Sequence, residues 1–152
     1  MTRVGIIIGS DSDKEVMNEA GTYLDYFGIE WEMKVSSAHR MPEETANYAK
    51  NAAANGISVI IAAAGMAAHL PGVVAAFTDI PVIGVPLDAS PLGGLDALYS
   101  IVQMPAGIPV GTVTIGKDGA RNSAVLAARI IALQDENVRK KLEEFRKNKF
   151  KL

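Results

Sequence analysis

The chain has 152 residues, which is a common size for one domain, and 49% of its residues are apolar while 21% are charged. A net charge of −2 at pH 7 excludes the basic surface with which proteins bind nucleic acid or anionic membranes. The lack of cysteine excludes disulfides, thiolate nucleophiles and sulfur-based zinc sites, and two histidines are too few for a His-rich metal site.

Strand and helix patterns alternate along the first part of the chain. Residues 4–8 are rich in β-branched side chains, as in a buried strand, and a helical spacing of apolar residues follows as far as Phe27. The next segments predict a strand over residues 30–35, a loop over 36–41 and a helix that begins at Pro42 and ends at Gly56.

The alternation continues to the C-terminus. We predict strands over 57–62, 81–85 and 110–115, helices over 95–102 and 124–133, and loops over 63–68 and 116–122. Pro71 and Gly72 either begin or kink a further helix, which continues over 73–77. A charged amphipathic helix is expected over 136–149, docked as a flap or as an arm between subunits. Together these segments predict a single α/β domain with a doubly wound parallel sheet whose ligands bind at the carboxyl ends of the strands.

The loop after the first strand has the sequence Gly-Ser-Asp-Ser-Asp over residues 9–13. Free backbone amides and the helix dipole make such a turn a good anion site, and Ser10 and Ser12 add hydroxyl groups. Asp11 and Asp13 would repel a phosphate placed against them, so at least one carboxylate is better suited to ribose hydroxyls. The alternative is that Ser10, Asp11 and Ser12 only cap the helix.

The loop after the second strand contains Ser36, Ser37, His39 and Arg40. An imidazole titrates near neutral pH and can act as a base and then as an acid, while a guanidinium can bind a phosphate or a carboxylate. A lone loop histidine is more often structural than catalytic, but the position of this one at a strand end favours function. We therefore interpret the two loops as parts of one active site.

A third candidate segment runs from Ala62 to Ala68 and consists almost entirely of small, uncharged residues. Backbone can approach a ligand closely there, and a small apolar molecule could lodge near Ala64 and Gly65, with His69 adding an imidazole. The alternative is close packing of a helix on the sheet, with His69 as the first residue of that helix.

Five segments in order resemble the PurE family of purine biosynthesis. They begin at Gly9, Ser36, Ala67, Pro81 and Ser100, and read GSDSD, SSAHRMP, AAHLPG, PVIGVP and SIVQMPAGIPV. The resemblance covers nearly the whole chain. It implies a three-layer, flavodoxin-like fold, a homo-octamer, and interconversion of N5-carboxyaminoimidazole ribonucleotide and 4-carboxy-5-aminoimidazole ribonucleotide without ATP, metal, biotin or another cofactor.

By the matching motifs, the resemblance implies that His39 is the acid/base group and that Ser10, Asp13 and Arg40 bind the ribonucleotide. Ser12, Ser37, Ala64, Gly65 and His69 complete the expected substrate site. In the implied reaction the carbamate releases carbon dioxide, the small-residue segment retains it, and C4 of the imidazole recaptures it. The segment departs from the family's usual Gly-Ala-Gly-Gly because Ala63 and Met66 replace glycines, and Met41 replaces the usual threonine.

Two alternative functions stay open at this stage. A related enzyme class carboxylates aminoimidazole ribonucleotide directly with carbon dioxide, although the motif Ala68-His69-Leu70-Pro71-Gly72 favours the mutase. A non-catalytic nucleotide-binding module is also possible because a fold does not fix a function. The N-terminal apolar run is too short for a signal peptide and no segment is long enough to span a membrane, so we expect a cytoplasmic protein.

Overall fold

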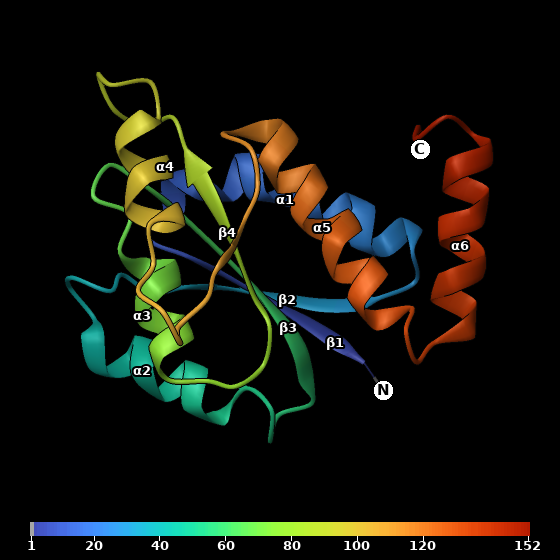
Figure 1. Ribbon diagram of the computed structural model, residues 1–152, viewed down its shortest axis with the longest axis horizontal. Helices are drawn as coiled ribbons and strands as arrows, with labels where there is room; N and C mark the ends of the chain where they lie inside the picture. The colour runs from blue at the N-terminus through green and yellow to red at the C-terminus, as the bar shows by residue number, and fades with distance from the viewer. Residues whose placement is uncertain (1) are drawn as a thin grey trace.

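The computed structural model describes residues 2–152 as a parallel sheet of five strands in the order β2-β1-β3-β4-β5 (Figure 1). The strands are β1 (Arg3–Ile8), β2 (Glu30–Val35), β3 (Ile57–Gly65), β4 (Val82–Leu87) and β5 (Gly111–Thr112). The helices are η1 (Asp11–Asp13), α1 (Lys14–Tyr26), α2 (Pro42–Asn51), α3 (Leu70–Ala76), α4 (Leu95–Val102), α5 (Lys117–Ile131) and α6 (Glu136–Lys147).

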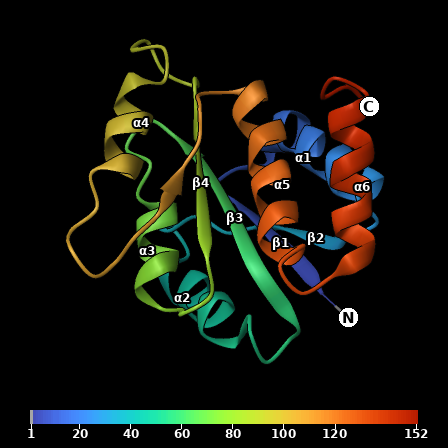
Figure 2. The same cartoon turned by 45° about the vertical axis from the view of Figure 1, so that its right-hand side comes forward.

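Helices cover both faces of the sheet, as two views of the chain show (Figures 1 and 2). On one face, α1 and α5 pack against alternate residues of the strands, and on the other α2, α3 and α4 do so. Each face buries its own apolar cluster because successive side chains of a strand point in opposite directions. The strand order is that of the flavodoxin-like fold, so the predicted doubly wound, three-layer architecture is confirmed.

The central strand β3 is longer than predicted, because Ala63, Ala64 and Gly65 belong to it and not to the following loop. These residues pair with Val85, Pro86 and Leu87 of β4, and Ala63 also pairs with Ile8 of β1. Alanine and glycine have a low intrinsic preference for strands, but pairing with β4, the second pairing of Ala63 with β1, and the burial of both alanines outweigh it. The predicted loop therefore begins three residues later, at Met66.

The loop predicted over residues 116–122 is wrong, since α5 begins at Lys117. Gly119 looks like a loop signal, yet it is buried within the helix, where a Cβ atom would lie 1.8 Å from the carbonyl oxygen of Thr114. The glycine is present because backbone approaches it closely. The strand predicted over 110–115 is reduced to Gly111–Thr112, since β5 is an edge strand paired only with β4.

Helix α6 packs on its own chain, outside α1 and α5 (Figure 2). Phe145 is buried, and its ring packs edge to face against Tyr23 and Phe27 and at a tilt against Tyr26, with ring centroids 5.4 to 5.9 Å apart. Asp135 caps the helix by accepting hydrogen bonds from the backbone amides of residues 137 and 138. The C-terminal helix is thus part of the helix layer on that face, and it ends two residues before the predicted residue 149.

None of the helices in residues 2–152 is both long enough and apolar enough to cross a lipid bilayer.

Candidate active site

The loop between β1 and α1 is organised by Ser10. Its backbone is extended, and its Oγ accepts hydrogen bonds from the amide of Ser12 at 3.4 Å and from the hydroxyl of Ser12 at 3.0 Å. Ser10 is therefore the cap of the short helix η1, which leads directly into α1. The capping role and a ligand-binding role are compatible, because Ser10 also lines the cavity described below.

The loop after β2 is anchored by Ser36, which is fully buried. Its amide donates to the carbonyl of Ile8, and its hydroxyl lies 2.8 Å from that of Thr45 on α2. Further along, the hydroxyl of Ser37 accepts a hydrogen bond from the amide of Arg40. These bonds fix the loop beside the carboxyl end of β1. Arg40 in this loop is exposed, and within residues 2–152 it forms no ion pair.

The two histidines of the chain are in contact. The Nε2 atom of His39 lies 2.6 Å from Nδ1 of His69, and the two rings meet edge to face with centroids 4.8 Å apart. His69 stands at the N-cap position of α3, but its side chain caps no backbone amide and is free to reach His39. At this contact one imidazole must donate its N–H and the other must accept, so a proton can be shared between two loops that are 30 residues apart.

Two adjoining cavities, of about 320 and 390 Å³, lie at this edge of the sheet. Both are lined by the loops after β1, β2 and β3, and they share the residues Gly9, Ser10, Ser37, His39, Gly65, Met66 and Ala67. Ser12, Asp13, Ala64 and His69 line only the first cavity, and Arg40 lines only the second. Every site residue predicted from the sequence therefore borders one or both cavities.

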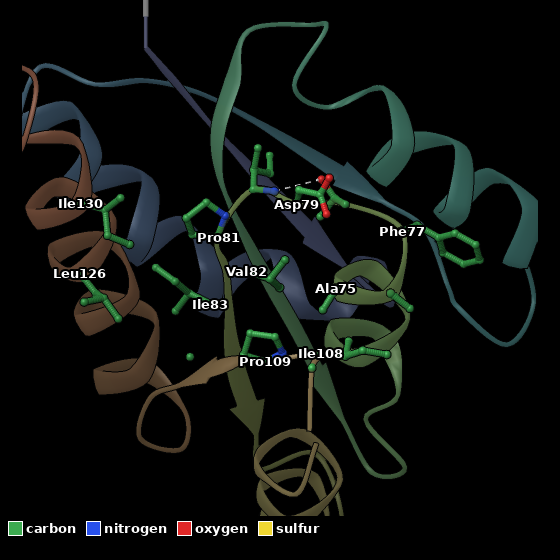
Figure 3. Close-up of a pocket in the computed structure, with 15 residues that line it drawn as sticks. Ala75, Phe77, Asp79, Pro81, Val82, Ile83, Ile108, Pro109, Leu126 and Ile130 are labelled. Carbon is green, nitrogen blue, oxygen red and sulfur yellow. Dashed lines mark hydrogen bonds between the residues drawn. The ribbon is translucent and has the colours of Figure 1, made fainter. Parts of the chain in front are cut away.

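A larger cavity, of about 860 Å³, lies elsewhere (Figure 3). It surrounds the start of β4 at Pro81 and Val82, with side chains of α3, α5 and the segment before β5 around it. Most of the side chains that line it are apolar, and the one charged side chain among them is that of Asp79. In open parallel sheets, ligands bind at the carboxyl ends of the strands, so we assign the chemistry to the two smaller cavities.

Asp13 is the one acidic residue that lines these cavities. Burial raises the pKa of its carboxyl group above the ordinary value of 3.8, and a hydrogen bond with the backbone of Ser10 opposes this only in part. Asp11, in contrast, lines neither cavity; it is exposed and pairs with Lys14 at 2.6 Å. Of the two carboxylates in the loop, Asp13 is therefore the one placed to meet a ligand.

The segment between β3 and α3 is tightly folded. Met66 has φ = 56°, in the left-handed region that favours glycine, and consecutive amide-to-carbonyl bonds join Ala68 to Met66 and His69 to Ala67. A non-glycine residue pays about 1–2 kcal/mol for this conformation. Met66 lines both cavities and is 57% exposed, so it stands at their rim, at a position where the family pattern has glycine.

Residue Ala89 is a part of the site that the sequence analysis missed. It follows β4, lines the first cavity and lies against Gly65, where a Cβ atom would be 2.9 Å from that of Ala89. Ala89 could have been found from its position just after the fourth predicted strand, because the carboxyl ends of neighbouring parallel strands meet at one edge of the sheet. No group of three or more metal-ligating side chains occurs in the part of the chain that the structure describes.

Comparisons with known proteins agree on the family. The sequence model described as AIR carboxylase matches residues 3–151. A protein of Vibrio vulnificus named N5-carboxyaminoimidazole ribonucleotide mutase is 57% identical, with 95% of this chain and 89% of that protein covered. Proteins with the same name from Pyrococcus abyssi and Thermotoga maritima are 56% and 53% identical, covering 97% and 96% of this chain and 84% of each of them.

A solved structure with this fold is the crystal structure of Treponema denticola PurE. It superposes with a TM-score of 0.89 at 29% sequence identity, and covers 98% of this chain and 92% of that chain. A 3-dehydroquinate dehydratase-like protein of Bifidobacterium longum is only 16% identical, with a TM-score of 0.57 over 87% of this chain and 99% of that chain. The second likeness concerns the fold alone.

Proposed function

The chain belongs to the AIR carboxylase family, and from this premise we propose that it is an N5-carboxyaminoimidazole ribonucleotide mutase of purine biosynthesis. The three relatives of that name reported above are 53–57% identical to this chain over at least 95% of its length. The observation in the structure that most supports the proposal is the contact of His39 with His69 beside the Ser10–Asp13 loop, because it joins a proton-transfer group to a polar ligand cradle.

We assign the ribonucleotide to the two smaller cavities. Arg40 and the amide of Ser10 suit the phosphate, because a guanidinium and a helix start both favour anions. Asp13 suits the ribose, since an ionised carboxylate accepts hydrogen bonds from hydroxyl groups. Ser37 adds one further hydroxyl to this polar half of the site.

The reaction breaks one bond to carbon dioxide and forms another. When the N5–carboxylate bond breaks, carbon dioxide leaves and the N5 nitrogen gains a proton. The C4 carbon, which is part of an enamine, then attacks carbon dioxide, and loss of the C4 proton restores the aromatic ring. The two steps balance, because one proton is taken up and one is released, and His39 is the group that exchanges them.

Retention of carbon dioxide between the two steps is the role that we assign to the small-residue side of the site. Ala64 and Gly65 are the last two residues of β3, and together with His69 they line the first cavity. A carbon dioxide molecule held there reacts within one complex, which avoids the entropic cost of recapturing it from dilute solution. His69 orients His39 through their hydrogen bond and completes this wall.

We also propose that the chain acts in the cytoplasm as a homo-octamer. The lack of cysteine fits a reducing compartment. Helix α4 supports assembly, because Leu95, Tyr99 and Val102 follow one another along its outer face and are 46–60% exposed, with Leu92 just before them at 66%. A continuous apolar row of this kind is suited to contact with another subunit.

The test is an absorbance assay of the purified protein with each candidate substrate. We expect 4-carboxy-5-aminoimidazole ribonucleotide to form from the carbamate without ATP, metal or added bicarbonate. His39→Asn should still bind the product in calorimetry but should not turn over. Formation of product only from aminoimidazole ribonucleotide plus bicarbonate would identify a direct carboxylase, and binding without any turnover would identify a non-catalytic module.

A further inference from the structure

The loop after β3 contains one side chain that the mechanism has not used. Between Ala64 and Ala68, every residue except Met66 is alanine or glycine, so Met66 alone carries atoms beyond Cβ. It lines both cavities of the site, together with its neighbours Gly65 and Ala67. Met66 is therefore the longest side chain that this loop brings to both cavities.

The backbone at Met66 is held in place by its surroundings. The residue keeps a left-handed conformation, with φ = 56°, immediately before the two tight turns that lead to His69. Non-glycine residues persist in such conformations where the neighbouring structure determines them, and they gather at ligand sites. Met66 directly follows Gly65, the last residue of β3, and shares the lining of the first cavity with His69.

The chemistry of this position is apolar. A thioether is flexible, polarisable and uncharged, so it offers a dry contact to a small apolar molecule and can move aside when a larger ligand enters. The polar residues of the first cavity include Ser10, Ser37 and Asp13, which suit the sugar phosphate and not carbon dioxide.

We propose that the Met66 side chain covers the mouth between the two cavities and retains carbon dioxide between its release and its recapture. The inference rests on the proposed function. It assigns to this chain a retention device at a position where the family pattern has glycine. It also explains why the strained conformation at residue 66 is occupied by a long apolar side chain.

The experiment follows a labelled carboxylate. The carbamate substrate is prepared with ¹³C in its carboxyl group and converted in buffer with unlabelled bicarbonate, and mass spectrometry measures the label that remains in the product. We expect the wild type to retain most of the label. Met66→Ala and Met66→Gly should release label and free aminoimidazole ribonucleotide at least about fourfold more often, which is the factor for one methylene group removed from an apolar contact.

Three variants separate the side chain from the backbone. Met66→Leu keeps an apolar side chain of similar size and should retain label as the wild type does. Met66→Ala removes the cover but keeps a Cβ atom in the left-handed conformation, whereas Met66→Gly removes both the cover and the strain. If only the glycine variant loses label, the backbone and not the cover controls retention, and the proposal is wrong.

The result also separates this inference from the function on which it rests. Equal label retention in the wild type and in all three variants would overturn the role of Met66 while leaving the mutase activity established. A wild type that forms no product from the labelled carbamate would overturn the proposed function itself.

Discussion

The contact between His39 and His69 leads to a prediction about how the two residues combine. Replacing His39 by Asn removes the group that exchanges the C4 proton, and general acid–base catalysis by one residue is worth about 10²–10⁴ in rate. Replacing His69 by Asn removes only the hydrogen bond at 2.6 Å, in an exposed part of the site. A typical hydrogen bond contributes about 0.5–1.5 kcal/mol, which corresponds to about 2- to 13-fold.

The double variant makes this distinction measurable. If His69 acts only by orienting His39, the variant that lacks both should be about as slow as His39→Asn alone, since there is no longer an imidazole to orient. The assay is the initial rate of 4-carboxy-5-aminoimidazole ribonucleotide formation at saturating substrate, with product affinity measured by calorimetry on the same preparations. Affinity should change little, because neither imidazole holds the sugar phosphate.

Two results would refute this reasoning. Losses that multiply in the double variant would mean that the two histidines act independently. A His69→Asn loss as large as that of His39→Asn would mean that His69 transfers a proton itself and is not merely a positioning residue.

Three further predictions concern packing, charge and assembly. Gly119→Ala should lower the free energy of unfolding, measured in urea at fixed protein concentration, by about 1–3 kcal/mol, because the new Cβ meets the Thr114 carbonyl. The control Gly111→Ala has room for its Cβ and should be neutral or stabilising. Equal stability of the two variants would contradict the close packing at Gly119. Because the pKa of Asp13 is raised, the folded protein should lose stability as pH rises from 3.8 through that raised pKa. Asp13→Asn should be more stable at neutral pH and bind product more weakly, and an unchanged pH dependence of unfolding would contradict this. Tyr99→Asp, which places a charge in the exposed row of α4, should reduce the mass measured by light scattering while leaving the circular dichroism unchanged; an unchanged mass would exclude α4 from the interface.

The sequence was most informative where one local signal decides the structure. Pro42 begins α2 as predicted because its fixed φ suits the first turn of a helix, and strand β2 has the predicted bounds, Glu30–Val35. The position of the candidate site could also be predicted, because it depends on where the strands end. Polar loops that follow strands of a parallel sheet are brought to one edge, so Ser10 and His39 were expected together.

The features that could not be predicted depend on contacts between distant residues. Ala63 and Ala64 resemble loop residues until the pairing with β4 is known, and Gly119 resembles a loop residue until the approach of Thr114 is seen. The bond between His39 and His69 depends on how the loops after β2 and β3 fold against each other, which no local pattern encodes. The left-handed conformation of Met66 has the same origin, in the turns that connect β3 to α3.

The most direct test of the central claim is a crystal structure of the protein with bound 4-carboxy-5-aminoimidazole ribonucleotide. The account predicts that the product bridges the loops, with its phosphate near Arg40 and the amide of Ser10, its ribose at Asp13, and C4 with its carboxylate beside His39. A product bound in the larger cavity around Pro81, or one that touches only one of the two loops, would contradict it.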